Sequence, residues 1–130
     1  MEHLSALEAS LEAVAANCED VVPPVYASLF EKFPEYEALF ALDTDMGVRG
    51  HMLNEAVSMA EGLLQNDPIA TYFISAMRMD HEGYGVPDDL FESFYRVMSD
   101  VFRDIAGEAW SDEMTAAWVA VENAAKATKS

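Results

Sequence analysis

The sequence predicts an all-α fold of about seven helices in a single domain that covers residues 1–130. Apolar residues recur at steps of three and four through most of the chain, which is the spacing of one face of an α-helix. No stretch alternates apolar and polar residues with the period of two that marks a half-buried strand. Proline and glycine divide the helical pattern into segments of unequal length, which is not typical of a symmetric four-helix bundle.

Composition limits the class of protein. The 130 residues are 52% hydrophobic, which is enough to bury a core and is not the composition of a disordered chain. Only 7 basic residues, scattered along the chain, accompany 24 acidic ones, and the formal net charge is −17. Nucleic acid and anionic membrane surfaces are therefore poor partners, because no basic cluster can neutralise phosphates.

Export and membrane signals are missing from the sequence. No apolar run approaches the length of a membrane span, and residues 1–3 lack the basic and apolar regions of a signal peptide. Cys18 is the only cysteine, so no internal disulfide can form, and its place on an apolar stripe predicts a buried, inert thiol. We therefore expect a cytoplasmic protein.

The first three helices are predicted from apolar stripes and prolines. A stripe at helical spacing predicts a helix over residues 3–18. Pro23 and Pro24 open the second helix, because proline is tolerated in the first helical turn. Pro34 ends that helix and starts a short helical turn that reaches Phe40.

The next two helices flank residues 66–68. The pair Thr44-Asp45 signals the start of a long helix over residues 46–65. Asn66-Asp67-Pro68 then ends this helix and begins the next one. The following helix ends where Gly83 and Gly85 form a turn.

Two helices complete the predicted fold. Val86-Pro87-Asp88 marks the start of another helical segment, and a strongly apolar helix begins at Leu90 and ends at Gly107. Ser111-Asp112-Glu113 caps the last helix and places acidic groups at its positive end. We expect Trp118 to face inward from this helix.

His81 lies in the last turn of a predicted helix, just before the glycine turn. A neutral imidazole there can bind a metal through one ring nitrogen, while the other nitrogen donates to a backbone carbonyl one turn back, near Met77. That hydrogen bond would fix the tautomer and make the ligand more basic. A single histidine of this kind is more often structural than ligating, so the rest of the chain has to decide.

Five motifs, well separated along the chain, occur together in a familiar order. They are residues 25–30, residues 33–35 followed by Phe40, residues 49–53, residues 81–86, and the pair Ala117-Trp118. In this order they resemble the bacterial single-domain globins and the haem domain of flavohaemoglobins. The resemblance runs from the second predicted helix to Trp118, and it implies a globin fold around a haem pocket.

The resemblance implies roles for several side chains. His81 would be the proximal ligand to the iron of haem b. Tyr26 would be the distal tyrosine, whose hydroxyl donates to the bound gas, and Phe40 would pack on the porphyrin face. Each has an ordinary alternative, in which Phe40 is core and the Tyr26 hydroxyl reaches the surface. The implied pocket walls are Phe30, Phe40, Leu53, Met77, Val86 and Phe94.

Residues 49–53 supply the distal face of the implied pocket. Arg49 stands where the family usually has glutamine or histidine, and it could donate to the gas, pair with a haem propionate or face solvent. Gly50 would let the second helix and the long helix cross at close range, and Leu53 would face the ligand. His51 lies about 200° round the helix from Arg49 and should face away from the iron.

The resemblance leaves three functions open. The leading one is a haem-binding globin that reversibly binds a diatomic gas (oxygen, nitric oxide or carbon monoxide), as in oxygen transport. The second is a nitric oxide dioxygenase that depends on a separate reductase. Tyr26 favours that enzyme, but Phe91 stands where flavohaemoglobins have a proximal tyrosine, and the sequence ends before their proximal glutamate. The third is a haem-free globin-fold sensor or interaction module, which would not need His81, Tyr26 and Phe40 together.

Overall fold

Helices make up most of the described chain, which comprises residues 2–83, 85–86 and 90–128 of the computed structural model. In order they are α1 (Glu2–Asn17), α2 (Val22–Lys32), the 3₁₀ helix η1 (Pro34–Phe40), α3 (Gly47–Leu64), α4 (Pro68–Glu82), α5 (Leu90–Ala106), the short 3₁₀ helix η2 (Gly107–Ala109) and α6 (Asp112–Lys126). No strand occurs in the described residues, so the predicted all-α class is confirmed. Among these helices, none is both long and apolar enough to cross a lipid bilayer.

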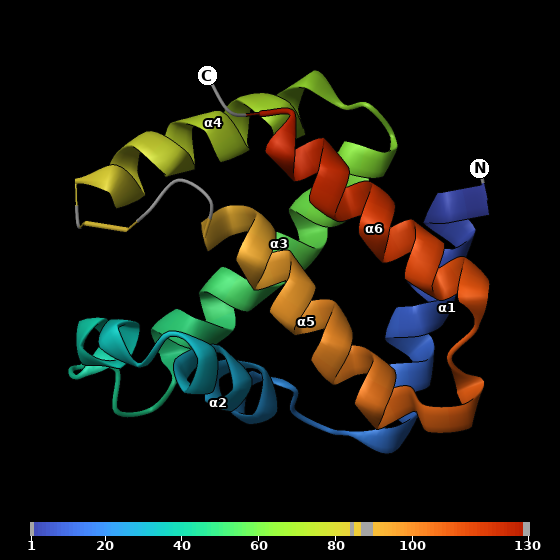
Figure 1. Cartoon of the computed structure of the whole chain (residues 1–130), viewed down its shortest axis with the longest axis horizontal. Helices are drawn as coiled ribbons and strands as arrows, with labels where there is room; N and C mark the ends of the chain where they lie inside the picture. Colours follow the sequence, from blue (N-terminus) through green and yellow to red (C-terminus); the bar gives the residue numbers. More distant parts are fainter. Residues whose placement is uncertain (1, 84, 87–89, 129–130) are drawn as a thin grey trace.

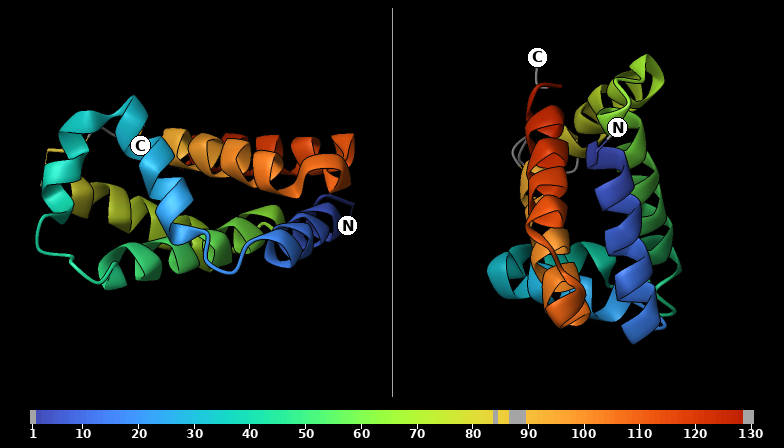
Figure 2. Two further views of the ribbon diagram at one scale, coloured as in Figure 1. Left: turned by 90° about the horizontal axis from the view of Figure 1, so that it is seen from below. Right: turned by 90° about the vertical axis from the view of Figure 1, so that its right-hand side faces the viewer.

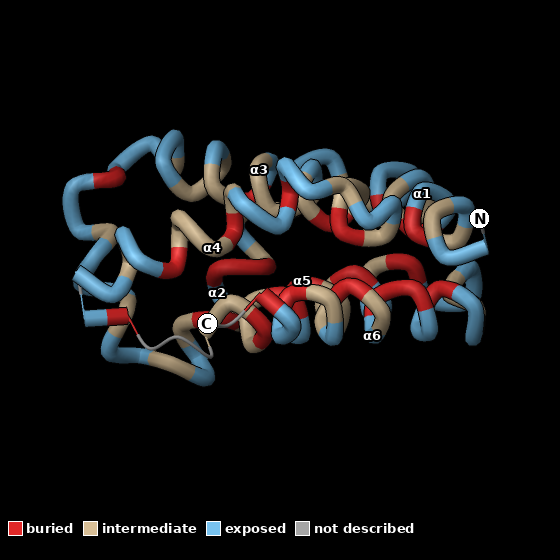
Figure 3. The backbone as a smooth tube through the Cα atoms, turned by 90° about the horizontal axis from the view of Figure 1, so that it is seen from above, coloured by how far each residue is buried: buried red, intermediate tan, exposed pale blue. Residues whose placement is uncertain are grey.

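The helices form two layers (Figure 1, Figure 2). The first layer holds α1, α3 and α4, the second holds α5 and α6, and α2 crosses at one end. Helix α6 packs against α1, α3 and α5, while α2 packs against η1, α3 and α5. The buried residues gather between the two layers (Figure 3), so the core is a slab enclosed by both.

Trp118 faces the core, as its sequence position predicts, and it joins three helices. Its ring meets Phe102 of α5 edge-on, with the ring centroids 5.6 Å apart. Its indole Nε1–H donates to Ser10 Oγ of α1 over 2.9 Å. A buried indole N–H needs such a partner, and this contact therefore sets how α1, α5 and α6 meet.

Two predicted helix starts and one predicted turn are confirmed. Asp67 Oδ1 accepts a hydrogen bond from the backbone N–H of Ile69 (3.0 Å), and Ser111 Oγ accepts one from Met114 (3.2 Å). Gly85, in the turn after α4, has φ +81°, which glycine adopts without steric strain. The turn therefore ends α4 directly after the segment that carries the candidate ligand.

The start of α3 differs in part from the prediction. Asp45 accepts one backbone N–H of the first turn (3.0 Å), as expected of a cap. Asp43, which the sequence places in a plain loop, accepts two more, from Val48 (2.9 Å) and Arg49 (3.0 Å). The residue directly before α3 is Met46, which has φ 60° and whose side chain does not cap the helix. The left-handed backbone at Met46 brings the Asp43 carboxylate back over the helix start.

Cys18 lies just outside α1 and is half-buried, so the prediction of a buried thiol on the helix was wrong. The helix ends at Asn17, whose side-chain amide donates to the Ile105 carbonyl (3.0 Å). The Cys18 thiol then donates to the Asp20 carbonyl (3.3 Å) in the connection to α2. Its place in that connection, at the margin of the core, is what leaves it partly exposed.

The glycine that allows two helices to pack closely is Gly62 and not Gly50. A Cβ added to Gly62 would lie 2.7 Å from the Cβ of Ala70, which is too short for two carbon atoms. At Gly50 the nearest atom to an added Cβ would be Val22 Cγ2, at 3.9 Å, which is an ordinary contact. Gly62 therefore lets α3 and α4 pack closely, and this fixes the helix that carries His81.

Candidate functional site

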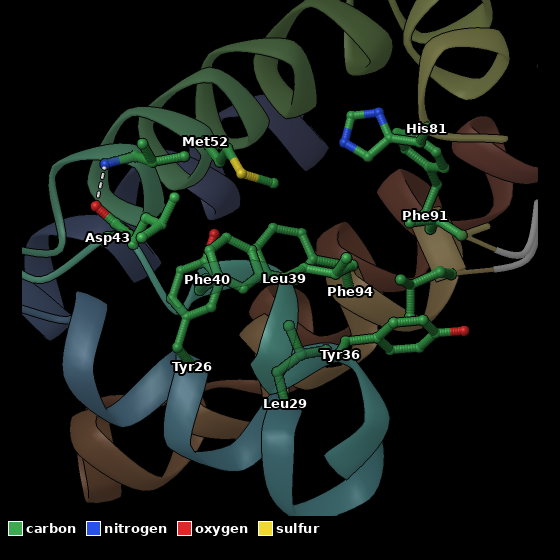
Figure 4. A pocket seen from close by; sticks show the side chains of 14 residues that line it. Tyr26, Leu29, Tyr36, Leu39, Phe40, Asp43, Met52, His81, Phe91 and Phe94 are labelled. Carbon is green, nitrogen blue, oxygen red and sulfur yellow. Dashed lines mark hydrogen bonds between the residues drawn. The ribbon is translucent and has the colours of Figure 1, made fainter. Parts of the chain in front are cut away.

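An apolar cavity of about 380 Å³ opens at the end of the molecule where α2 crosses the two layers. Figure 4 shows its walls. The lining residues are Tyr26, Leu29, Tyr36, Leu39, Phe40, Leu42, Asp43, Val48, Met52, His81, Val86, Leu90, Phe91 and Phe94. This volume lies within the range of small-molecule sites, and such sites combine apolar walls with a few placed polar groups.

His81 enters the cavity from the last turn of α4 (Figure 4). Its Nδ1 lies 2.8 Å from the backbone carbonyl oxygen of Met77, one turn earlier, as the sequence predicts. Because a carbonyl can only accept, Nδ1 carries the proton in the neutral ring. The lone pair of Nε2 is then available to bind a metal, and the hydrogen bond at Nδ1 makes that lone pair more basic.

Tyr26 approaches the cavity from α2, on the side opposite to His81 (Figure 4). The residue is 2% exposed, and its hydroxyl oxygen has no hydrogen-bond partner. Among the described residues it is the single buried side-chain polar atom in this condition. Burial raises the pKa of Tyr26, since the phenolate would lose its hydration, so the hydroxyl stays protonated and is a donor. An unmet donor of this kind costs about 1–3 kcal/mol.

Three aromatic rings hold the Tyr26 ring in place. Its centroid lies 5.6 Å from that of Phe40, 5.7 Å from Phe94 and 5.9 Å from Phe30. Phe30 and Phe40 also meet each other, at 5.5 Å. Tilted and edge-on contacts at these separations are favourable for aromatic pairs. The Tyr26 hydroxyl is thus held by packing alone, with its direction set by α2, η1 and α5.

Arg49 forms an ion pair with Asp43 and is not among the residues that line the cavity. Its Nε donates to Asp43 Oδ2 (3.0 Å), and a terminal nitrogen donates to the Asp43 carbonyl oxygen (2.6 Å). The guanidinium carbon lies 5.6 Å from the Phe40 ring centroid. Burial by itself would raise the pKa of the Asp43 carboxyl, but the N–H groups of Val48 and Arg49 and the guanidinium outweigh burial and lower it. None of the three placements expected for Arg49 included this ion pair.

The sequence comparisons agree with this architecture. A family model described as Globin matches residues 24–127, about four fifths of the chain. The chain belongs to the globin family. Comparisons with curated proteins and with solved structures gave no significant match. Globins generally bind haem and diatomic gases. The match confirms the expectation of a globin, and the finer resemblance to bacterial single-domain globins and flavohaemoglobins stays a prediction.

Helix α3 of this globin is rotated relative to the expectation. Leu53, expected to face the ligand, is 2% exposed and belongs to the core between the layers. Val48 and Met52 line the cavity instead, four residues apart on one helix face. His51 is exposed and lies 3.8 Å from Glu55, so it faces away from the cavity as expected.

Half of the expected walls line the cavity of the globin. Phe40, Val86 and Phe94 do so, whereas Phe30 packs behind Phe40, and Leu53 and Met77 are not lining residues. Nine lining residues were not predicted: Leu29, Tyr36, Leu39, Leu42, Asp43, Val48, Met52, Leu90 and Phe91. The spacing of three residues from Tyr26 could have indicated Leu29, since both share one face of α2.

The residues present can hold a haem group. His81 offers one imidazole nitrogen for iron, and the Tyr26 hydroxyl offers a donor that has no partner within the chain. The walls between these two groups are mostly apolar, with Phe40 and Phe94 on them. The cavity therefore has an imidazole nitrogen that could bind a metal on one side and a hydrogen-bond donor on the other.

Proposed function

We propose that this globin binds haem b through His81 and thereby binds oxygen, or nitric oxide, reversibly on the side of Tyr26. The order of its motifs supports a place among the bacterial single-domain globins. Haem supplies an iron atom with a free coordination position for a diatomic gas. One observation carries the proposal, namely the Tyr26 hydroxyl, which is buried without a partner in a cavity that His81 also enters.

The chain contributes three things to gas binding. The hydroxyl of Tyr26 donates a hydrogen bond to the bound gas, and a bond to a charged acceptor is worth about 1.5–3 kcal/mol. His81, held by the Met77 carbonyl, presents one defined tautomer to the iron. Apolar walls such as Phe40 and Phe94 limit the entry of water and protons, which slows oxidation of ferrous haem.

Nitric oxide dioxygenase activity with a separate reductase is the second candidate, and it is favoured by the same donor. Haem, if bound, would supply the iron at which oxygen reacts with nitric oxide, and the Tyr26 hydroxyl would be the donor that stabilises negative charge on that side of the cavity. The rate of nitric oxide consumption with a supplied reductant separates the two functions. Turnover far above that of free haem would assign the enzyme, whereas slow consumption would assign reversible gas binding.

Absorption spectra of the ferric, ferrous and carbon monoxide forms test the proposal. The wild type should show a Soret band that shifts with carbon monoxide, and His81→Ala should lose or alter this behaviour. His51→Ala is the matched control, because His51 is an exposed histidine on α3 that faces away from the cavity. A His81→Ala spectrum identical to the wild type would contradict the role of His81. Failure to take up added haemin would instead favour a haem-free sensor or interaction module.

A further inference from the structure

A buried ion pair lies beside the candidate proximal ligand. Arg78 of α4 and Glu92 of α5 are 6% and 4% exposed, and a terminal nitrogen of the guanidinium donates to Glu92 Oε1. The Nε of Arg78 donates to Thr128 Oγ1 (2.9 Å), and a terminal nitrogen donates to the Ala125 carbonyl oxygen (2.6 Å). One guanidinium thus joins α4 to α5 and to the C-terminal end of α6.

Stability alone does not explain this arrangement. Buried ion pairs can often be replaced by apolar residues of similar size without loss of stability, because the attraction of the pair is offset by desolvation of both charges. What Arg78 provides beyond an apolar residue is a planar group with several donors in fixed directions. Here those donors bind three separate acceptors, on Glu92, Ala125 and Thr128, so the plane of the guanidinium is fixed.

Phe91 connects this fixed group to His81. The guanidinium carbon of Arg78 lies 4.9 Å from the Phe91 ring centroid, a cation–π distance. The same ring lies 5.3 Å from the imidazole of His81, centroid to centroid, with 74° between the planes. Arg78 precedes His81 by three residues, so both side chains leave the same side of α4. Phe91 therefore contacts the guanidinium and the imidazole at once.

We propose that Arg78 is a positioning residue for His81. Held by Glu92 and by the end of α6, it keeps the Phe91 ring against the imidazole, and this contact limits rotation of the imidazole plane. The Met77 carbonyl limits the same ring at Nδ1, so the imidazole is held at two points. Any effect of Arg78 on a bound iron rests on the proposed haem site. The restraint that Arg78 places on the His81 imidazole does not depend on haem.

The main test replaces both charges with apolar side chains, in Arg78→Met/Glu92→Met. The double variant keeps the buried volume similar and removes both charges of the Arg78–Glu92 pair together, so we expect it to fold. In the haem-free protein, nitrogen-15 NMR of labelled histidine should show a protected His81 Nδ1–H in the wild type. Its exchange with water should be faster in the double variant, because the imidazole is then held at one point only.

The haem-loaded protein provides a second readout. The iron–histidine stretching band of the ferrous form should broaden and move to lower frequency in the double variant, since a looser imidazole is a weaker ligand. Transfer of haem to an excess of a haem-accepting apoprotein should be about 10–100-fold faster, the usual effect of losing a group that orients a metal ligand. Phe91→Leu should cause the same changes, and combining it with the double variant should add little, because Arg78 acts through that ring.

Tyr95→Phe is the matched control for general loosening. Tyr95 is buried on α5, and its hydroxyl donates to the Ala56 carbonyl (2.8 Å), away from His81. This control should lower stability while leaving both the exchange of His81 Nδ1–H and the stretching band as in the wild type. If the double variant behaves like the control in both readouts, Arg78 is only structural and the proposal is wrong. If no haem binds, the exchange measurement alone decides the role of Arg78.

Discussion

Replacing Tyr26 by phenylalanine should have opposite effects on the haem-free protein and on the protein with bound gas. In the haem-free chain the hydroxyl is buried and has no hydrogen-bond partner. Phenylalanine keeps the three ring contacts of this side chain and removes only the unmet donor. Because such a donor costs about 1–3 kcal/mol, we expect the free energy of unfolding to rise by about that amount.

With haem and oxygen bound, the same change should weaken gas binding. The lost hydrogen bond to a charged acceptor is worth about 1.5–3 kcal/mol, and 1.4 kcal/mol corresponds to a factor of ten. The oxygen dissociation rate of Tyr26→Phe should therefore rise by about 10–150-fold. The association rate should change far less, because the hydrogen bond forms only after the gas has entered.

Two assays read these effects. Urea unfolding of the haem-free protein gives the free energy of unfolding, and stopped-flow displacement of oxygen by carbon monoxide gives the dissociation rate. Tyr95→Phe is again the control, because its hydroxyl has a partner in the Ala56 carbonyl. That variant should lose about 0.5–1.5 kcal/mol and keep the wild-type dissociation rate. If Tyr26→Phe also loses stability, its hydroxyl has a partner after all, and an unchanged dissociation rate would remove Tyr26 from gas binding.

Three further predictions concern helix packing, the dependence of stability on pH, and the cavity wall. Gly62→Ala should lower the free energy of unfolding by about 1–3 kcal/mol, because the added Cβ would overlap Ala70 of α4. Gly50→Ala should instead raise it by about 0.4–1 kcal/mol, and equal effects of the two variants in urea unfolding would contradict this. Folding lowers the pKa of the Asp43 carboxyl, so the stability that this carboxylate contributes is complete above about pH 4 and is lost as the pH falls below that value. Asp43→Asn should remove this pH-dependent part, and urea unfolding curves at acidic pH will measure the difference. Leu53→Ala should lower the free energy of unfolding by about 2–5 kcal/mol and leave the oxygen dissociation rate unchanged, whereas Met52→Ala should change that rate. A stopped-flow measurement in which Leu53→Ala altered the rate more than Met52→Ala would refute this.

Features that depend on one helical turn were predictable from the sequence. The hydrogen bond from His81 to the Met77 carbonyl is such a feature, because the geometry of α4 alone brings the two groups within reach. The caps at Asp67 and Ser111 are also local, since a short side chain reaches the N–H groups two or three residues ahead. The order of such local features along the chain was enough to indicate the globin family.

Arg49 shows where this reasoning ends. Its type and register suggested the gas, a propionate or solvent as its partner, but it binds Asp43. That pair forms because the chain turns back at Met46, which has a left-handed backbone that no residue preference indicated. The distal side of the cavity therefore depends on a loop conformation more than on the helix pattern.

Whether Leu53 or Met52 lines the cavity depends on the rotation of helix α3 about its axis. Neighbouring residues differ by about 100° around a helix axis, and both of these side chains are apolar. Leu53 is buried in the core, whereas the half-buried Met52 lines the cavity. An apolar pattern records that a helix face is covered, and it does not record whether protein or a ligand covers it.

By itself the sequence determined the all-α class, most helix bounds and the two groups, His81 and Tyr26, on which the proposed function depends. Only the tertiary structure decided that the Tyr26 hydroxyl is left without a partner and that Arg78 reaches Thr128, which is 50 residues away in the chain. The physical reason is the range of the interactions. Turns, caps and helical periodicity act between near neighbours, whereas burial and buried hydrogen bonds depend on which helices meet and at what rotation.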